Sequence, residues 1–350
     1  MPDSGNTLLA GVVGAGAFGR NHARVYRELQ SDPGNKVRFV GVFDADFRRA
    51  QAVADEFGVS AYGSLDALIA SDVHACSVAV PTAAHLEVAR YLMQNGIDVL
   101  IEKPLATTVA EADELIAIAE QHGRTAQVGH LERFNPAVRA TLPVLTQPMF
   151  FEVHRLSVFS PRALDVDVVL DLMIHDLDIV LTFVNSPVKE VRAVGLPILS
   201  SKVDIANARL EFESGCVANF TASRVSTERI RKLRFFQPRQ YVSVDYARQD
   251  VLVLTVDESS PDPASLDPFN PVSAVLSGLP GITPFKPAIE QQEPLRAELE
   301  SFLHAVRNRS TPEVTLEDGR RALALAIQII DAIAEHSRRV RLPELTRMRS

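Results

Sequence analysis

Tryptophan is absent from this chain and cysteine nearly so, since only Cys76 and Cys216 occur. Two cysteines in apolar runs cannot form a disulfide framework, so we expect reduced core thiols and a reducing compartment, the cytoplasm. Long apolar runs are missing as well, because no stretch approaches the roughly 18 residues that a membrane helix needs. The segment of residues 1–7 is short and polar, so we expect neither a signal peptide nor membrane insertion.

Basic residues are not in excess either. Lysine and arginine number 36 against 44 acidic residues, which gives a formal net charge of −8 at pH 7. Domains that bind nucleic acid carry a basic surface, so this balance argues against nucleic acid as a partner. We also expect no bound metal.

The chain does contain enough apolar material for two domains, with 350 residues of which 46% are hydrophobic. In residues 1–130, strand-like and helix-like segments alternate. The strand-like runs are 8–13, 37–43, 75–80, 99–101 and 125–128, and the helix-like runs are 18–29, 47–57, 85–95 and 109–122. This alternation predicts an α/β domain, a Rossmann-type doubly wound parallel sheet with right-handed crossovers.

Residues 131–350 follow a different pattern, in which strand follows strand. The strand-like runs are 150–158, 206–212, 216–225, 233–236 and 241–246, and helix-like runs close the chain at 295–307 and 317–336. Ser214 and Gly215 form a turn signal between two of the strands. We therefore predict an α+β domain with a largely antiparallel open sheet. Residues 257–290 contain seven prolines and are expected to form a long irregular loop.

A glycine pattern marks the junction of the first strand and the first helix. Gly14, Gly16 and Gly19 have the spacing G-x-G-x-x-G. Gly14 permits a tight turn, Gly16 lets the backbone approach a pyrophosphate, and Gly19 allows close packing of helix on strand. The amino end of the helix, with Ala17 and Phe18, would then face the phosphates of a dinucleotide.

The second strand ends at Asp44, 25 residues after Gly19. An acidic side chain at this position bonds the adenosine ribose hydroxyls, which favours NAD over NADP. Arg48 and Arg49 keep NADP as an alternative, because arginine is the residue that would hold a 2′-phosphate.

Glu102, Lys103 and Pro104 stand where a buried strand ends. The preceding run, residues 98–101, is apolar enough to be covered on both faces, and proline prevents the strand from continuing. Ligands of an open parallel sheet bind beyond the carboxyl ends of its strands, so Lys103 is a candidate contact for a ligand. Taken by itself, the pattern favours an ordinary lysine at a strand end that reaches into water.

Asp171 and His175 form a second candidate pair in the other domain. If the segment is helical, the spacing of four residues puts both side chains on one face. A carboxylate favours and orients a protonated imidazole, and such a histidine can accept a hydroxyl proton while hydride leaves the same carbon. A surface ion pair is the alternative.

Three motifs follow one another in this chain: G-x-G-x-x-G, then Glu-Lys-Pro at a strand end, then Asp-x-x-x-His in the second domain. This combination resembles the glucose–fructose oxidoreductase/inositol dehydrogenase/rhizopine-catabolism (Gfo/Idh/MocA) family of NAD(P)-dependent sugar oxidoreductases. The resemblance covers essentially the whole chain. It implies that Pro81, Thr82 and His85 lie near the nicotinamide, with Glu102 and Lys103. It further implies that Lys103 contacts the reacting hydroxyl, that His175 is the general base, and that Asp171 assists it or binds substrate. Either Lys103 or His175 could take the proton.

Within the family, residues 129–136 and 171–178 are similar to the branch that oxidises C3 of UDP-N-acetylglucosamine to a 3-keto sugar for lipid A or a related glycan. Arginines that could meet the diphosphate, together with two polar neighbours, are the candidate substrate ligands Arg133, Asn135, Arg155, Arg162, Asp171 and Arg224. A solvated strand face or a subunit contact would also explain the basic segment 224–239.

Three other functions remain open. The chain could oxidise a free sugar or an inositol-type polyol, cleave a glycoside with transiently reduced NAD, or act as a non-enzymatic dinucleotide sensor. The family resemblance also implies a homodimer or homotetramer formed through the sheet of the second domain.

Overall fold

The computed structural model describes residues 7–32, 34–159, 166–256 and 282–340. The chain forms two compact units, the first made of residues 1–134 and 292–324, the second of 135–291 and 325–350. The sequence-based boundary after residue 130 did not anticipate that residues 292–324 belong to the first unit. No helix in the described part of the chain is both long and apolar enough to cross a bilayer.

The first unit contains a six-stranded parallel sheet in the order β3-β2-β1-β4-β5-β6, which confirms the predicted doubly wound α/β fold. Its strands are β1 (Leu8–Val13), β2 (Val37–Phe43), β3 (Ser60–Tyr62), β4 (Ala75–Val78), β5 (Asp98–Glu102) and β6 (Ala126–Gly129). The order reverses between β1 and β4, so their carboxyl ends form the crevice in which such sheets bind ligands.

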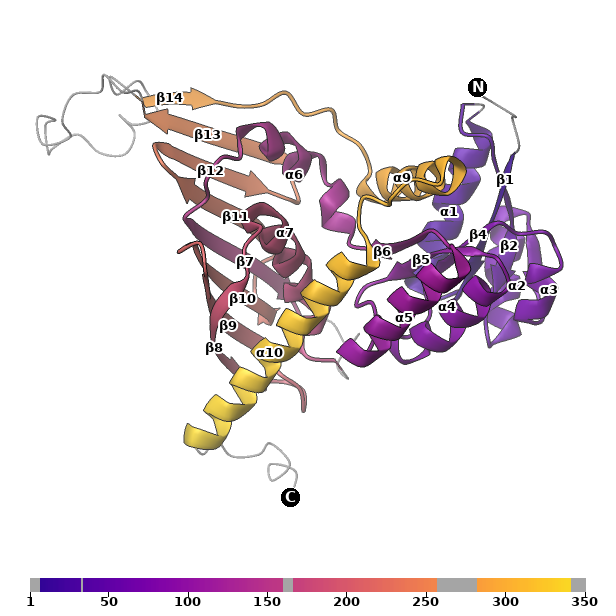
Figure 1. Ribbon diagram of the computed structural model, residues 1–350, viewed down its shortest axis with the longest axis horizontal. Coiled ribbons are helices and arrows are strands. Elements are labelled where there is room, and N and C mark those ends of the chain that lie inside the picture. Colours follow the sequence, from indigo (N-terminus) through magenta and orange to yellow (C-terminus); the bar gives the residue numbers. More distant parts are fainter. Residues whose placement is uncertain (1–6, 33, 160–165, 257–281, 341–350) are drawn as a thin grey trace, which may run out of the picture. The chain divides into compact units, whose positions relative to one another are not determined.

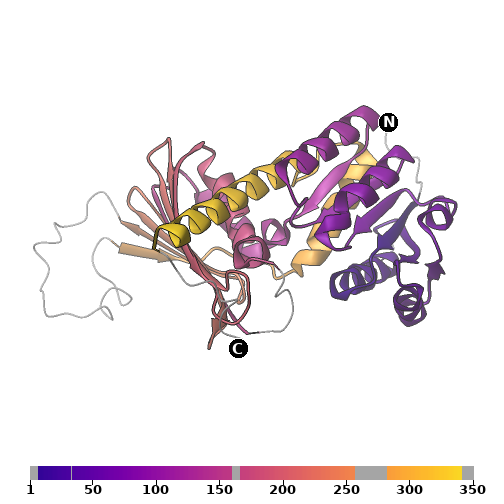
Figure 2. The ribbon, with the colours of Figure 1, turned by 90° about the horizontal axis from the view of Figure 1, so that it is seen from below.

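Helices cover both faces of this sheet. They are α1 (Ala17–Ser31), α2 (Phe47–Phe57), α3 (Leu65–Ile69), α4 (His85–Gln94), α5 (Val109–His122) and α9 (Pro294–Asn308). Helices α4 and α5 lie side by side on one face, whereas α1 contacts α2 and α9 on the other (Figures 1 and 2). Apolar side chains of α9, including Leu299 and Phe302, join the core beneath α1, which is why this late segment belongs to the first unit.

The predicted strands and helices of residues 1–130 are all present, with ends within two residues of the expected positions. Strand β3 and helix α3 were not predicted. Both are short, three and five residues, so neither offers enough periodicity to be recognised.

The second unit contains an eight-stranded sheet in the order β14-β13-β12-β11-β7-β10-β9-β8. Its strands are β7 (Phe150–Val158), β8 (Val188–Leu196), β9 (Ile205–Phe212), β10 (Val217–Ser226), β11 (Ile230–Gln237), β12 (Gln240–Asp245), β13 (Asp250–Val256) and β14 (Ile282–Phe285). All neighbouring pairs are antiparallel except β7 with β10, which confirms the prediction of a largely antiparallel sheet.

One face of this sheet is covered by helices α6 (Pro136–Thr141), α7 (Ile174–Val184) and part of α10 (Leu316–Val340), as Figure 1 shows. Buried and partly exposed residues alternate along the strands, so the opposite face is only partly covered. The division between the two units falls inside α10, after Ala324.

Strands β8, β13 and β14 were missed by the sequence analysis. Part of the expected irregular loop at 257–290 is wrong, because residues 282–285 form β14 and pair with β13. Pro284 lies in this edge strand, where a missing amide donor is tolerated. The proline was one of those that led us to predict a loop. Residues 257–281 lie outside the described residues.

Candidate active site

The glycine-rich loop has the geometry of a phosphate cradle. Gly14 adopts φ +101°, and a Cβ there would lie 2.4 Å from the Ala79 carbonyl oxygen, so the loop rests directly on the end of β4. A Cβ at Gly19 would lie 1.7 Å from the Gly14 carbonyl oxygen, so that position holds α1 against the loop. A Cβ at Gly16, in contrast, would meet nothing within 4 Å. The open side of Gly16 is where a pyrophosphate could approach the backbone.

The amino end of α1 carries no side-chain cap among the described residues. The backbone N–H groups of its first turn, at Ala17 and Phe18, have no acceptor within the helix. They therefore point a set of donors and the positive end of the helix dipole at the same open space.

Asp44 binds the glycine-rich loop as well as its own turn. Its Oδ2 accepts a hydrogen bond from the Ala15 amide at 2.6 Å, and its Oδ1 accepts one from the Asp46 amide at 2.8 Å. Each carboxylate oxygen can accept more than one hydrogen bond, so the group keeps capacity for a ribose hydroxyl.

His85 is buried and links two loops. Its Nδ1 lies 3.0 Å from the Pro104 carbonyl oxygen, and its Nε2 lies 3.0 Å from that of Val80. Burial lowers the pKa of His85, although these carbonyl contacts oppose the shift. Pro81 and Thr82, at the start of a short 3₁₀ turn (Thr82–Ala84), are more exposed. His85 thus holds the loop after β4 to the segment that follows Lys103.

Lys103 follows Glu102, the last residue of β5, and its side chain is half-buried. Glu102 accepts a hydrogen bond from His22 Nε2 at 2.8 Å. Burial opposes ionisation of Glu102, but His22 and the charge of Lys103 hold the pKa of its carboxyl below the usual value. The Glu-Lys-Pro segment therefore ends the strand with a carboxylate anchored inward and a cation beside it.

Asp171 and His175 lie at a change of helix type in the second unit. Asp171 is in a π-helical turn (Val169–Met173), and His175 is the second residue of α7. Both side chains are half-buried. The sequence analysis assumed a regular α-helix here. The wider turn alters the angle between the two side chains, and such turns often occur at functional sites.

The predicted substrate ligands near residue 133 have partners within their own units. The Nη2 atom of Arg133 lies 3.7 Å from Oδ1 of Asp318, a residue at the start of α10. Asn135 is buried and caps α6, since its Oδ1 accepts from the Ala137 amide at 3.0 Å while its Nδ2 donates to the Tyr246 carbonyl.

Two of the predicted arginines form buried ion pairs. Arg155 donates from Nε and Nη2 to both oxygens of Asp176, at 2.6 and 3.0 Å. Arg224 donates to Asp204 at 2.8 Å and to the Val166 carbonyl at 2.6 Å. Burial opposes ionisation of Asp204, but backbone amides and the Arg224 guanidinium hold the pKa of this carboxyl below the usual value.

These contacts give both guanidinium groups a structural role in the second unit, whatever they contribute to a substrate. Arg162, the remaining predicted arginine, lies outside the described residues.

Sequence reasoning missed a polar cluster behind Glu102. His22 Nδ1 lies 3.0 Å from Ser77 Oγ, which in turn lies 2.9 Å from the Tyr26 hydroxyl. Glu298, on α9, is fully buried and faces the same group. The only signal in the sequence is the spacing of His22, three residues after the last glycine of the loop, on the face of α1 that packs on the sheet.

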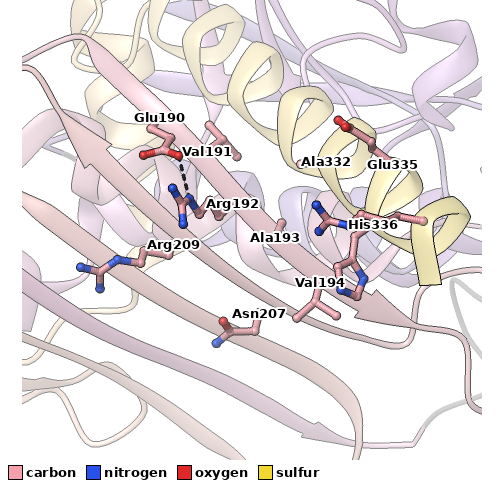
Figure 3. Close-up of a pocket in the computed structure, with 11 residues that line it drawn as sticks. Glu190, Val191, Arg192, Ala193, Val194, Asn207, Arg209, Ala332, Glu335 and His336 are labelled. Atoms are coloured by element: carbon pink, nitrogen blue, oxygen red, sulfur yellow. Dashed lines mark hydrogen bonds and ion pairs between the residues drawn. The ribbon is translucent and has the colours of Figure 1, made fainter.

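Two of the cavities formed by the described residues lie apart from these side chains. One, of about 480 Å³, is beside the end of β2 in the first unit and is lined in part by Phe43, Leu65 and Tyr91. The other, of about 690 Å³, lies along edge strand β8 of the second unit. Figure 3 shows Arg192 and Arg209 on its strands, with His336 on α10. None of the described residues that line the second groove was predicted to belong to the site.

Comparison with known families gives two matches. A family model described as "Oxidoreductase family, NAD-binding Rossmann fold" matches residues 8–130, and one described as "GFO/IDH/MocA C-terminal domain" matches residues 148–239. The two models thus match one part of each unit.

Individual relatives extend this similarity over the whole chain. The UDP-N-acetylglucosamine 3-dehydrogenase of Acidithiobacillus ferrooxidans is 35% identical over 327 residues, which are 93% of this chain and 97% of that protein. A solved structure of that enzyme has a TM-score of 0.83 and covers 94% of this chain and 98% of its own.

Other relatives are more distant. The scyllo-inositol 2-dehydrogenase (NAD(+)) of Bacillus subtilis is 27% identical over 61% of this chain and 67% of that protein. An oxidoreductase of Agrobacterium radiobacter, solved with NAD+, L-tartaric acid and magnesium, is 15% identical and has a TM-score of 0.78 over 95% of this chain and 97% of its own, so the two share the fold.

Proposed function

Because the chain belongs to the GFO/IDH/MocA family of NAD-binding oxidoreductases, we propose that it is a dehydrogenase that oxidises the 3-hydroxyl of UDP-N-acetylglucosamine. The observation that carries this proposal is the 35% identity to a UDP-N-acetylglucosamine 3-dehydrogenase over 93% of the chain, which spans both units. Similarity in the second unit matters most, because the named relatives act on different substrates while the family model of the first unit is an NAD-binding domain.

The first unit fits NAD. The open side of Gly16 and the uncapped start of α1 suit a pyrophosphate, and Asp44 suits the adenosine ribose. The carboxylate of Asp44 would repel a 2′-phosphate, which favours NAD over NADP. The apolar lining of the cavity beside Phe43 and Tyr91 suits an adenine ring.

Residues of both units are assigned to the chemistry. Bound NAD supplies the acceptor for a hydride from the sugar carbon. We assign to Lys103 a contact with the hydroxyl oxygen, because a fixed cation stabilises the negative charge that develops there. We assign to His175 the acceptance of the hydroxyl proton, while Asp171 orients the His175 side chain or contacts the sugar. The product is a 3-keto nucleotide sugar, and its carbonyl group suits a following amination in lipid A or related glycan synthesis.

Two further assignments accompany the proposal. Both cysteines are buried and free, which is consistent with a reducing compartment, and we assign the reaction to the cytoplasm. We also propose a homodimer or homotetramer built on the sheet of the second unit. An apolar row crosses its partly covered face, made of paired residues on six neighbouring strands: Val217, Phe150, Phe236, Tyr241, Leu254 and Pro284.

The activity is tested by incubating the purified protein with NAD and UDP-N-acetylglucosamine while NADH absorbance is recorded. A coupled aminotransferase with its amino donor should be present, because accumulation of the keto sugar can stop the reaction. We expect turnover that depends on the coupling enzyme. UDP-glucose and myo-inositol serve as comparison substrates. Faster turnover of inositol would replace the nucleotide sugar by a polyol, and no turnover of any of the three would refute the proposal.

The Lys103→Ala variant tests the assignment of the site. We expect kcat to fall by about 100- to 1,000-fold, because an electrostatic contact to the developing alkoxide is lost, while NAD affinity changes little. Titration of NAD by calorimetry separates the two effects. Replacement of the exposed Lys36 by alanine is the matched control and should leave both quantities unchanged. Equal activity of Lys103→Ala and wild type would remove Lys103 from the reaction.

A further inference from the structure

Glu298 is a carboxyl group in the apolar core of the first unit. Its side chain is fully buried on α9, next to Leu299 and near Phe302, and neither carboxyl oxygen has a hydrogen-bond partner among the described residues. An isolated carboxylate in such a place is strongly destabilising, so the group must be neutral or must be matched by another polar group.

The titratable groups nearest the Glu298 carboxyl come from α1 and β5, while Gln127 on β6 donates a hydrogen bond to the backbone carbonyl of Glu298 at 3.2 Å. The side-chain ligand atoms of His22, Glu102 and Glu298 all lie within 4.8 Å of one another. Behind His22, Ser77 and Tyr26 continue the hydrogen-bonded chain. The titratable groups next in line are Lys103 and His85, which act on Glu102.

The hydrogen bonds in this chain have a consistent direction. The Tyr26 hydroxyl can donate to Ser77, and Ser77 to His22 Nδ1, which leaves the Nε2–H of His22 to donate to Glu102. Glu102 then has a donor and can be ionised. Two carboxylates this close in a buried site cannot both be ionised, so the proton must stay on Glu298.

A metal ion is the other way to satisfy Glu298, and the geometry disfavours it. His22 Nε2 and Glu102 Oε1 already lie 2.8 Å apart as hydrogen-bond partners, and His22 Nδ1 is engaged by Ser77. A cation between these atoms would have to separate them and take the place of the proton.

We propose that Glu298 is a neutral carboxylic acid, which leaves Glu102 as the ionised member of this buried pair. The lack of a hydrogen-bond donor for either Glu298 oxygen in the described part of the chain and the closeness of Glu102 both favour the protonated form. Glu102 keeps its hydrogen bond from His22 and immediately precedes Lys103, so the single negative charge of the pair lies next to this lysine in the chain.

Burial and the neighbouring charge of Glu102 raise the pKa of Glu298 well above its usual value. A carboxyl group with a raised pKa contributes stability that is complete below its unfolded pKa and is lost as pH rises through the folded one. Glutamine at this position carries no titrating proton, so the variant Glu298→Gln should lack this dependence.

The protonation state is tested without substrate. Infrared difference spectra of wild type against Glu298→Gln should contain the carbonyl stretch of a protonated carboxylic acid at pH 7. The folding equilibrium constant of Glu298→Gln relative to wild type should rise with pH, by about tenfold per pH unit between the unfolded and the folded pKa of Glu298. Glu300→Gln is the matched control, because Glu300 lies on the same helix but pairs with Arg296 near the surface. A ratio independent of pH, or one equivalent of metal in wild type that Glu298→Gln lacks, would overturn the assignment of a neutral carboxylic acid to Glu298.

Discussion

At the residue scale, the carboxylate of Asp44 has contacts on two sides, to the Ala15 amide in the glycine-rich loop and to the Asp46 amide in its own turn. Sequence spacing predicts the ribose contact alone. The additional bond to Ala15 follows from the sheet, which brings the ends of β1 and β2 together. Asp44 therefore supports the shape of the phosphate cradle as well as the choice of cofactor.

Replacing Asp44 by alanine should weaken NAD binding by about 10- to 100-fold, because a charge-assisted hydrogen bond is lost and the loop loses its anchor. NADP should lose less affinity, so the preference between the two cofactors should narrow. Calorimetric titration with each dinucleotide measures both values. Asp46→Ala is the control, since Asp46 caps α2 through the Arg48 amide and should affect stability alone. An unchanged NAD affinity in Asp44→Ala would contradict the assignment.

The arginines show what residue type cannot reveal. Arg155 and Arg224 look like phosphate ligands in the sequence, where a basic residue has no visible partner. The fold brings Asp176 to Arg155 and Asp204 to Arg224, each across 20 or 21 residues of chain. A buried guanidinium needs such a carboxylate, and only the folded sheet determines which acidic residue provides it.

At the scale of the element, the junction of β1 and α1 contains two glycines with different tasks. Gly19 is required by the close contact of helix and loop, whereas Gly16 leaves space outside the protein backbone. Gly16 has a φ of −70°, a value that alanine adopts readily. Both glycines belong to one sequence pattern, yet only one of them is needed for folding.

The pair Gly19→Ala and Gly16→Ala separates these tasks. Gly19→Ala should destabilise the protein by about 3 kcal/mol, because its Cβ would overlap the Gly14 carbonyl and force the helix to shift. Gly16→Ala should change stability by no more than about 0.5 kcal/mol but should weaken NAD binding. Thermal unfolding followed by circular dichroism, with and without NAD, gives both results. A large loss of stability in Gly16→Ala would contradict the assignment of its open side to the cofactor.

At the scale of the whole molecule, the apolar row on the partly covered face of the second sheet should mediate self-association. Phe236 is 36% exposed and contacts Phe150 and Tyr241 at ring distances of 5.6 and 5.2 Å. Phe236→Glu should reduce the molar mass in solution, because a charge would be buried against the apolar surface of a second copy. Light scattering after gel filtration measures the mass.

Phe47→Glu is the matched control for this prediction, since Phe47 is 49% exposed but belongs to the first unit and not to the row. It should leave the mass unchanged. A wild-type protein that is monomeric, or a Phe236→Glu variant with the mass of wild type, would exclude this face as the subunit contact.

The sequence by itself determined the strands and helices of residues 1–130 except β3 and α3, the glycine loop, Asp44 and the position of Lys103 at a strand end. These features depend on local periodicity and on turn residues, which involve only positions that are neighbours in the sequence. The alternation of strands in the second half was likewise sufficient to predict a largely antiparallel sheet.

Only the tertiary structure decided the rest. The return of residues 292–324 to the first unit, the carboxylate partners of Arg155 and Arg224, and the burial of Glu298 beside Glu102 all join segments far apart in sequence. Burial and pairing depend on position in the folded core. A glutamate can therefore be an exposed, ionised side chain at one position of a helix and a buried, protonated one at another. Lys103 therefore stands at a place that the sequence marked, beside a polar cluster that only the packing of α9 and α1 on β5 could assemble.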